Sequence, residues 1–273
     1  YPLRNLTGGM KFSGLSINLA SGTGSFNIIF PDGFKGGESA KFGFNSTLIN
    51  TTTDTMPFRP FGRAICRTDN AIHVAYVNDS RMVYTNSTDN GATWRPALNL
   101  DGIDGNDDPD ASATPAMDCK GTDIFVAWAC RTFFEPSVIC YRNSTNEGAT
   151  WSPFIDNNAP SWADYSVGSD NVGVPSVMFG NSYNGINNIW VAYVHDTGGS
   201  TERINITNST AYGGNIPPLT KIEMLQDIDS GGPTIFVNIS GSTEEIYVPY
   251  VSGADFDLYI NYSTNSGSTW SGA

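Results

Sequence analysis

The most regular feature of the chain is a short run of β-branched and aromatic residues that recurs along it. The copies read IHVAYV from Ile72, IFVAWA from Ile124, IWVAYV from Ile189 and IYVPYV from Ile246. Runs of this composition, bounded by polar residues and glycine, are typical of β-strands. A second run follows each copy and ends in a serine that begins a polar turn; these second runs start at Met82, Val138, Ile204 and Leu258. The sequence therefore predicts a repeated antiparallel strand pair.

The polar turn is the most specific signal in the sequence. It reads STDNGATW from Ser87, STNEGATW from Ser144 and STNSGSTW from Ser263, with a decayed copy, STAYGGN, from Ser209. The third position can accept backbone N–H groups, the glycine at the fifth permits the turn, and the tryptophan can bury its ring beside the hairpin. These residue types favour a structural staple over catalysis and predict equivalent buried tryptophans. The motif residues are Ser87, Asp89, Gly91, Trp94, Ser144, Asn146, Gly148, Trp151, Ser263, Asn265, Gly267 and Trp270.

This pattern, S-x-D-x-G-x-T-W, resembles the Asp-box of bacterial neuraminidase repeats, and the resemblance extends from about Phe26 to Trp270. It implies an all-β fold, a sialidase-like β-propeller of four-stranded antiparallel blades. A degenerate copy near the N-terminus brings the visible repeat units to about five. Either that segment supplies a missing outer strand, or the chain is part of a six-bladed or longer protein. One domain, 1–273, is predicted, with a degenerate blade at 1–57 and repeats at 58–100, 101–155, 156–220 and 221–273.

The resemblance also suggests where sialidase chemistry would lie. In the family an arginine in an F-R-I-P motif helps to grip the sialic-acid carboxylate, and the sequence FRP at Arg59 is one residue short of that motif. Asp79 stands near the place of the family's acid, and Tyr250 is a candidate for its tyrosine nucleophile. The arginine trio is incomplete, with only Arg131 and Arg203 as further candidates. The sequence therefore predicts little or no sialidase activity.

The net charge of −13 restricts the partners of the chain. Such a field repels phosphate backbones and anionic lipid, which argues against nucleic acid and membrane surfaces, although acidity could also serve solubility alone. No apolar run is long enough to insert into a bilayer. The acidic residues gather in the segments expected to face the ligand, opposite the Asp-boxes. A cation or a neutral glycan fits there better than sialic acid.

The densest acidic segment is DGIDGNDDPD, which starts at Asp101. Hard oxygen ligands in a loop suit Ca²⁺, although the spacing is not that of an EF-hand. A solvated acidic loop is the alternative interpretation. The sequence predicts Ca²⁺ as the one candidate cofactor, with the ligands Asp104, Asp107, Asp108 and Asp110.

Cysteines and glycosylation motifs bear on the location of the chain. Cys130 and Cys140 stand at the two ends of a short connection, where a hairpin brings two Cα atoms within disulfide reach, and Cys66 and Cys119 precede the same repeat element. Two disulfides are predicted, with free buried thiols as the alternative. Asn-x-Ser/Thr acceptors for glycan occur at Asn5, Asn45, Asn50, Asn78, Asn86, Asn143, Asn205, Asn208, Asn238 and Asn261. Asn86 and Asn143 are expected to be exposed, and the protein to be extracellular or at the cell surface.

Taken together, these features predict a glycosylated, non-catalytic extracellular propeller. Its function would be glycan binding, adhesion, or cell-surface or filament assembly. Its partners would be glycans or other surface proteins, with self-assembly as a further option. The alternative is an exo-sialidase or another secreted glycoside hydrolase that acts through a pair of carboxylates.

Overall fold

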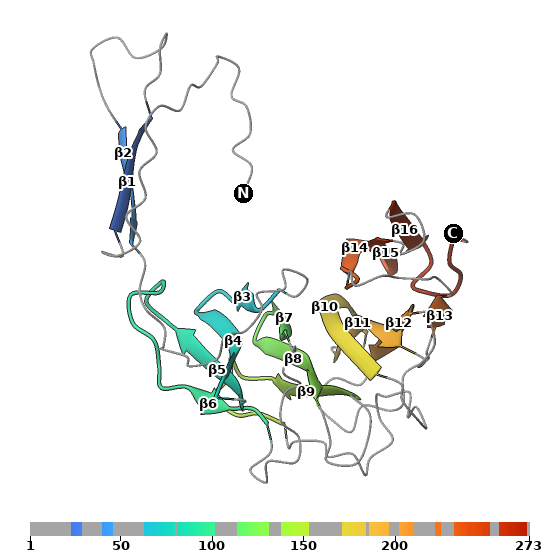
Figure 1. Cartoon of the computed structure of the whole chain (residues 1–273), viewed down its shortest axis with the longest axis horizontal. Coiled ribbons are helices and arrows are strands. Elements are labelled where there is room, and N and C mark those ends of the chain that lie inside the picture. Colours follow the sequence, from blue (N-terminus) through green and yellow to red (C-terminus); the bar gives the residue numbers. More distant parts are fainter. Residues whose placement is uncertain are drawn as a thin grey trace. The chain divides into compact units, whose positions relative to one another are not determined.

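The computed structural model of the chain contains two compact units, Tyr1–Thr51 and Thr52–Ala273 (Figure 1). All the elements that it assigns are strands. Among the residues that the structure describes, none forms a helix long and apolar enough to cross a membrane. The described residues are 23–28, 40–45, 63–79, 81–101, 114–130, 138–152, 171–183, 186–196, 202–209, 222–224, 232–251 and 257–271.

The first unit holds one antiparallel strand pair. β1 (Thr23–Ile28) pairs with β2 (Ala40–Asn45), and Phe26 lies opposite Phe42. The pair occupies the segment where the sequence suggests a degenerate copy of the repeat. Whether this unit is a propeller blade stays a prediction.

The described strands of the second unit form four antiparallel sheets, each of which pairs its strands in chain order. Blade 1 consists of β3 (Ile65–Arg67), β4 (Ile72–Asn78), β5 (Arg81–Ser87) and β6 (Leu98–Asn99). Blade 2 consists of β7 (Ala116–Lys120), β8 (Asp123–Cys130) and β9 (Val138–Ser144). Blade 3 consists of β10 (Asn171–Tyr183), β11 (Ile186–Asp196), β12 (Glu202–Ser209) and β13 (Ile222–Met224). Blade 4 consists of β14 (Phe236–Ser240), β15 (Thr243–Val251) and β16 (Leu258–Ser263).

This architecture confirms the predicted fold class, an all-β protein built from propeller-type blades. The recurring IxVAYV runs form the second strand of each blade, and the runs that end in serine form the third. Because side chains alternate along a strand, each second strand supplies apolar residues to both faces of its sheet. One detail differs from the sequence analysis: blade 3 extends to Met224, past the boundary predicted at 220/221.

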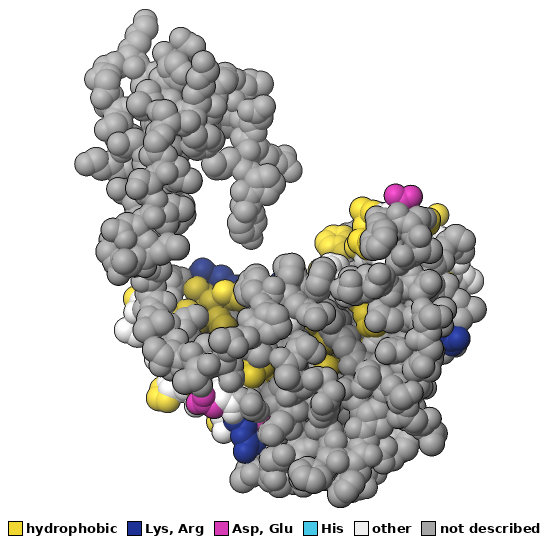
Figure 2. Space-filling view, in the orientation of Figure 1, with side chains coloured by type: hydrophobic (Ala, Val, Ile, Leu, Met, Phe, Trp, Pro, Cys, Tyr) yellow, Lys and Arg dark blue, Asp and Glu magenta, His cyan; other side chains and the backbone are white. Residues whose placement is uncertain are grey.

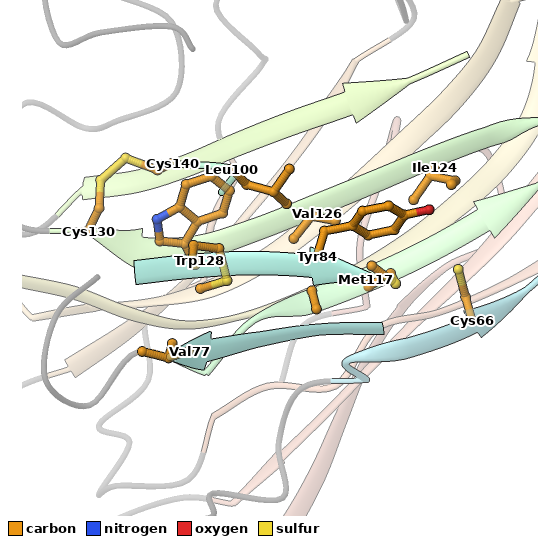
Figure 3. Close-up of a cluster of buried hydrophobic side chains, with 12 residues drawn as sticks. Cys66, Val77, Tyr84, Leu100, Met117, Ile124, Val126, Trp128, Cys130 and Cys140 are labelled. Carbon is orange, nitrogen blue, oxygen red and sulfur yellow. A yellow bond between two sulfur atoms is a disulfide. The ribbon is translucent and has the colours of Figure 1, made fainter. Parts of the chain in front are cut away.

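The hydrophobic cores lie between consecutive blades. Between blades 1 and 2, Val77 packs with Val126 and Trp128 (Figure 3). Alternate residues of the same β8 strand, Phe125 and Ala127, turn to the other face and form a core with blade 3. A third core joins blades 3 and 4.

The first strands of successive blades lie side by side: β3 beside β7, β7 beside β10, and β10 beside β14. The backbone N–H of Met117 donates to the carbonyl of Arg63 at 2.6 Å, and the Arg63 guanidinium lies 2.6 Å from the Asp118 carboxylate. The other Asp118 oxygen accepts a hydrogen bond from the backbone N–H of Phe179 at 2.8 Å. Asp118 therefore connects three consecutive blades.

Both predicted disulfides are present. Cys66–Cys119 joins β3 to β7, so it links two blades, whereas Cys130–Cys140 joins β8 to β9 within blade 2. The Cα atoms are 5.8 Å apart in each bridge. Disulfides persist in oxidising compartments, which fits the predicted secretion.

The three Asp-box turns share one hydrogen-bond pattern. In the first, the Ser87 hydroxyl donates to Asp89 at 2.7 Å, and the same carboxylate accepts the backbone N–H of Thr93 at 2.8 Å. The N–H of Gly91 donates to the Ser87 hydroxyl at 2.8 Å. Asn146 and Asn265 accept the equivalent bonds in the other turns. The structural role predicted for the motif is confirmed for its polar residues.

The tryptophans of the motif depart from the prediction. Trp94, Trp151 and Trp270 occupy equivalent positions, but each is half-buried rather than buried. The reason is that the ring packs at the surface between blades: Trp151 meets Tyr84 of blade 1 edge-on, with ring centroids 4.7 Å apart.

Asp89 provides a first testable prediction. Hydrogen bonds from Thr93 and Ser87 hold the pKa of Asp89 at about 2. We expect Asp89→Asn to keep the Tm near neutral pH, because asparagine makes the same turn at the two other sites. Asp89→Ala should lower the Tm by a few degrees through loss of these bonds.

The pH dependence of the same variants provides the control. A carboxylate with a lowered pKa stabilises the folded state at pH values above its ordinary pKa, and this contribution is lost as the pH falls toward 2. Asp89→Asn should therefore lose less Tm than the wild type between pH 4 and pH 2. Equal losses would show that the carboxylate is not held by the turn.

Candidate functional site

The antiparallel order of the strands divides each blade into two ends. The turn between β3 and β4 and the Asp-box turn between β5 and β6 lie at one end, and the turn between β4 and β5 lies at the other. The connection from blade 1 to blade 2 also starts at this other end, since β6 runs toward it. We call this second end the ligand end, because a ligand is expected at the end opposite the Asp-box turns.

Asp79 lies at the ligand end, in the tight turn between Asn78 and Arg81. It is exposed and has a positive φ of 50°, a conformation that aspartate tolerates in turns. This geometry is that of a turn former. It gives no support to the catalytic role considered for Asp79.

Asp101 is the first residue of the acidic segment and the one member that the structure describes. It is buried, accepts the backbone N–H of Met82 at 3.1 Å, and lies 3.7 Å from the Arg81 guanidinium. Asp101 also interacts electrostatically with Arg142 of blade 2. Burial lowers the pKa of Arg142, and the negative charge of Asp101 opposes that shift. Asp101 thus anchors the end of blade 1 rather than facing solvent.

Tyr250 is also placed inside the fold. Its ring is almost completely buried in the core between blades 3 and 4 and stacks on Tyr259, with centroids 5.8 Å apart. Burial raises the pKa of its phenol. A tyrosine in this position has no access to a substrate in the state shown, so the structure does not support its proposed role as nucleophile.

Arg203 lies in β12, opposite His195 of β11. The other remaining candidates fall outside the described residues. Arg59 and Arg131 are among them, as are the four aspartates proposed to bind Ca²⁺. Within the described part of the chain, no group of histidine, cysteine, aspartate or glutamate side chains could hold a metal ion. Calcium binding by Asp104, Asp107, Asp108 and Asp110 stays a prediction.

The sequence analysis missed two buried polar clusters at the Asp-box end. In the first, His73 is fully buried, with Nδ1 2.7 Å from the hydroxyl of Tyr84 and Nε2 3.1 Å from that of Thr68. Tyr84 extends to the Asp-box of blade 2, where its hydroxyl donates a hydrogen bond to the backbone carbonyl of Glu147 at 3.5 Å. The cluster therefore couples an Asp-box to the blade before it.

The second cluster surrounds Glu244, whose side chain is 3% exposed. Its carboxylate accepts the indole N–H of Trp190 at 2.6 Å and the amide of Asn188 at 3.0 and 3.2 Å. It also accepts the backbone N–H of Asn181. All three donors belong to blade 3 and Glu244 to blade 4, so this carboxylate fastens two blades together. A sequence signal for it was absent, because TEE beside a turn is typical of exposed residues.

Burial of His73 predicts a loss of stability in mild acid. Burial lowers the pKa of this imidazole to about 4, against an ordinary value of 6.5, and the charge of Glu147 only partly offsets the effect. The unfolded chain therefore takes up a proton first as the pH falls. The contribution of His73 is complete above pH 6.5 and shrinks by about 3 kcal/mol on the way to pH 4.

The measurement is urea unfolding of wild type and His73→Phe between pH 7.5 and pH 4, with phenylalanine chosen because Phe125 holds the equivalent position in blade 2. Subtracting the two curves removes the carboxylates that both proteins share. Parallel curves would mean that His73 is accessible to protons in the folded state.

The glycosylation motifs divide by exposure. Asn86 and Asn143 are buried, at 5% and 4%, so the exposure expected of them is wrong. The reason is that their motif is the end of a strand, where their carbonyls accept the N–H groups of Arg95 and Ser152. Asn238 is exposed, in the short β14 strand. Glycosylation itself stays a prediction, with Asn238 now the best placed of the described acceptors.

A scan against models of known protein families finds no match, and neither does a search of curated proteins. Solved structures do match. An endo-arabinase from Bacteroides thetaiotaomicron is 10% identical, with a TM-score of 0.48 over 80% of each chain. An α-L-arabinanase from Penicillium chrysogenum, complexed with arabinobiose, is 14% identical, with a TM-score of 0.49 over 91% of this chain and 72% of that one.

A thermostable family-43 glycoside hydrolase is 12% identical, with a TM-score of 0.45 over 80% of this chain and 73% of that one. None of these three proteins is described as a sialidase.

Proposed function

We propose that the chain is an extracellular carbohydrate-binding protein that holds neutral glycans at the ligand end of its blades. The observation that carries this proposal is that the polar groups of the Asp-box residues are already engaged in structural hydrogen bonds. Their hydroxyl, carboxylate and amide groups bond within the turn, and the turns of blades 2 and 4 pack on the preceding blade. Recognition of a ligand then falls to the other end.

The charge of the protein favours a neutral ligand. The net charge is −13, and the segment 102–113, which follows Asp101 at the ligand end, contains four aspartates. A sialylated or sulfated glycan would be repelled there, whereas the hydroxyl groups of a neutral sugar can donate to carboxylates. The disulfides support an extracellular setting.

Binding can be tested by calorimetry with arabinan and other neutral polysaccharides, with sialyllactose as the anionic comparator. We expect heat of binding with a neutral glycan, unchanged in Asp89→Asn, because that substitution lies at the Asp-box end. Hydrogen exchange with the ligand bound should protect the turn at residues 78–81 and leave the Asp-box turns unaffected. Protection of the Asp-box turns, or a preference for sialyllactose, would contradict the proposal.

Hydrolysis of the bound glycan is the second candidate function. It is favoured by the aspartates of the segment that follows Asp101, because a glycoside hydrolase needs two carboxylates that flank the scissile bond. Release of reducing sugar from the same polysaccharides tests it, followed by Asp→Asn substitutions of single residues in 102–113 and 153–170. Loss of hydrolysis with binding retained would establish an enzyme, and binding without hydrolysis would leave the non-catalytic function.

A further inference from the structure

The fourth position of the Asp-box has a left-handed backbone conformation. Its residues are Asn90, Glu147 and Ser266, with φ values of 59°, 56° and 54°, and the glycine that follows each also has a positive φ. In the first box the backbone N–H of Ala92 donates to the carbonyl of Asp89 at 3.4 Å. Asn-Gly is the preferred pair for a turn whose two central residues have positive φ. The turn geometry therefore explains why asparagine precedes glycine in this box.

The same Asn-Gly pair is chemically labile. The backbone nitrogen of Gly91 can attack Cγ of Asn90: the N–Cγ bond forms, the Cγ–Nδ2 bond breaks, and ammonia leaves with the proton of the Gly91 N–H. Water then opens the cyclic imide at one of its two carbonyls, which gives aspartate or isoaspartate. An amide and water become an acid and ammonia, so no oxidant or reductant is needed. Glycine favours the attack because it has no side chain to shield its nitrogen.

Hydrogen bonds hold both reacting groups in the folded turn. The Gly91 N–H donates to the Ser87 hydroxyl at 2.8 Å, and that hydroxyl donates to the Asp89 carboxylate at 2.7 Å. The Arg67 guanidinium of blade 1, where basic side chains are visible in Figure 2, donates to Oδ1 of Asn90 at 2.9 Å. Cyclisation requires rotation of the peptide between Asn90 and Gly91 and loss of the Gly91 proton. The bond to Ser87 opposes both, so the turn has to open before the reaction can start.

The asparagines at the third position of the other boxes are held more firmly. Oδ1 of Asn146 accepts from the Ser144 hydroxyl and from the N–H of Thr150, and its Nδ2 donates to the Thr150 hydroxyl. Asn265 makes the same three kinds of bond in blade 4. Each is followed by a residue whose side chain crowds the attacking nitrogen. Asn90 is therefore the reactive asparagine of the three Asp-boxes.

We propose that Asn90 is a site of spontaneous deamidation, and that the reaction proceeds from a locally opened Asp-box of blade 1. Local opening of a turn costs less free energy than global unfolding, so it sets the rate. The aspartate product can still accept from Arg67, whereas isoaspartate adds a methylene to the main chain and cannot keep the turn. The proposal is independent of glycan binding, because this turn lies at the end opposite the ligand end.

Peptide mapping of the aged whole chain tests the proposal by following the mass and isoaspartate content of the peptide that holds Asn90. A peptide is needed because a second Asn-Gly pair, at 184–185, lies outside the described residues. Near neutral pH, Asn90 should convert at least about tenfold more slowly in the folded chain than in urea. Asn90→Ser should show no conversion of this peptide and should keep the fold, because serine holds the equivalent position in blade 4.

Variants of the Asp-box separate local opening from global unfolding. Ser87→Ala removes the acceptor of the Gly91 N–H, so Asn90 of the folded variant should convert about three- to tenfold faster, the worth of one hydrogen bond. Ser144→Ala removes the equivalent bond in blade 2 and is the matched control, which should leave the rate at Asn90 unchanged. If Ser87→Ala does not fold, Asp89→Ala opens the same turn and should accelerate conversion, whereas Asp89→Asn should keep the wild-type rate.

Several results would overturn the proposal. Equal rates in the folded and the urea-unfolded chain would mean that the turn does not protect Asn90. Equal acceleration by Ser87→Ala and Ser144→Ala would mean that conversion follows global unfolding. A slower rate in Asp89→Asn would mean that the carboxylate helps to remove the Gly91 proton, so that the intact box promotes the reaction instead of delaying it.

Discussion

Gly267→Ala should destabilise the protein by about 3 kcal/mol or more, whereas Gly91→Ala should cost only about 1 to 2 kcal/mol. Both glycines hold the fifth position of an Asp-box, with φ values of +78° and +87°. The penalty for a side chain at positive φ is therefore common to the two variants. The difference comes from the neighbours of the added methyl group.

At Gly267 an added Cβ would lie 2.6 Å from the ring of Trp190, which is 1% exposed and held by its hydrogen bond to Glu244. At Gly91 the nearest atom is 3.9 Å away. Urea unfolding measures both costs, and Gly241→Ala, with φ +64° and nothing within 4 Å, provides the cost of the backbone alone. Equal losses at Gly267 and Gly91 would mean that the Asp-box of blade 4 does not pack on blade 3 in solution.

Glu244→Ala should destabilise the protein by about 3 to 5 kcal/mol, because it leaves several buried donors without an acceptor. The indole N–H of Trp190 and the amide of Asn188 would both lose their partner. Glu244→Gln keeps the volume and one acceptor oxygen, so its cost should be intermediate.

The neighbouring residue is a matched control for this variant. Glu245 lies on the opposite face of the same strand, half-buried, where it accepts hydrogen bonds from Asn238 at 2.9 Å and Tyr247 at 3.4 Å. Glu245→Ala should cost less than about 1 kcal/mol, as partly exposed polar contacts usually do. The midpoints of urea unfolding compare the two substitutions. A small effect of Glu244→Ala would require water to replace the carboxylate among the donors.

The features that were predictable from the sequence are those fixed over short distances along the chain. Strands follow from the IxVAYV runs, and the Asp-box turns follow from a polar side chain and a glycine two residues later. The Cys130–Cys140 bridge follows from two paired strands that are consecutive in the chain. In each case the interacting residues are near neighbours in sequence, so their geometry is set by local backbone rules.

The features that could not be predicted depend on which blade lies next to which. Glu244 and Trp190 are 54 positions apart, and nothing near either residue indicates that the other will cover it. The same applies to Asn143, whose motif suggests a modified surface residue although packing buries it. At the ligand end, the sequence identified Asp79 by analogy, but the tight turn around it reveals a different role.

The placement of the cores between blades has a consequence for how the chain can be divided. Blades 2 and 3 each contribute one face to the core before and one to the core after, and blades 1 and 4 each share one core with a neighbour, so no single repeat contains a complete core. The unit that was copied along the sequence is therefore not the unit that folds. A fragment holding one blade should be unfolded, and a fragment of blades 1 and 2 is the smallest that encloses a whole core and its interblade disulfide. Circular permutation between blades would preserve every core except the one at the new chain ends. The loss in free energy of unfolding for each permutant would measure how strongly adjacent repeats depend on each other.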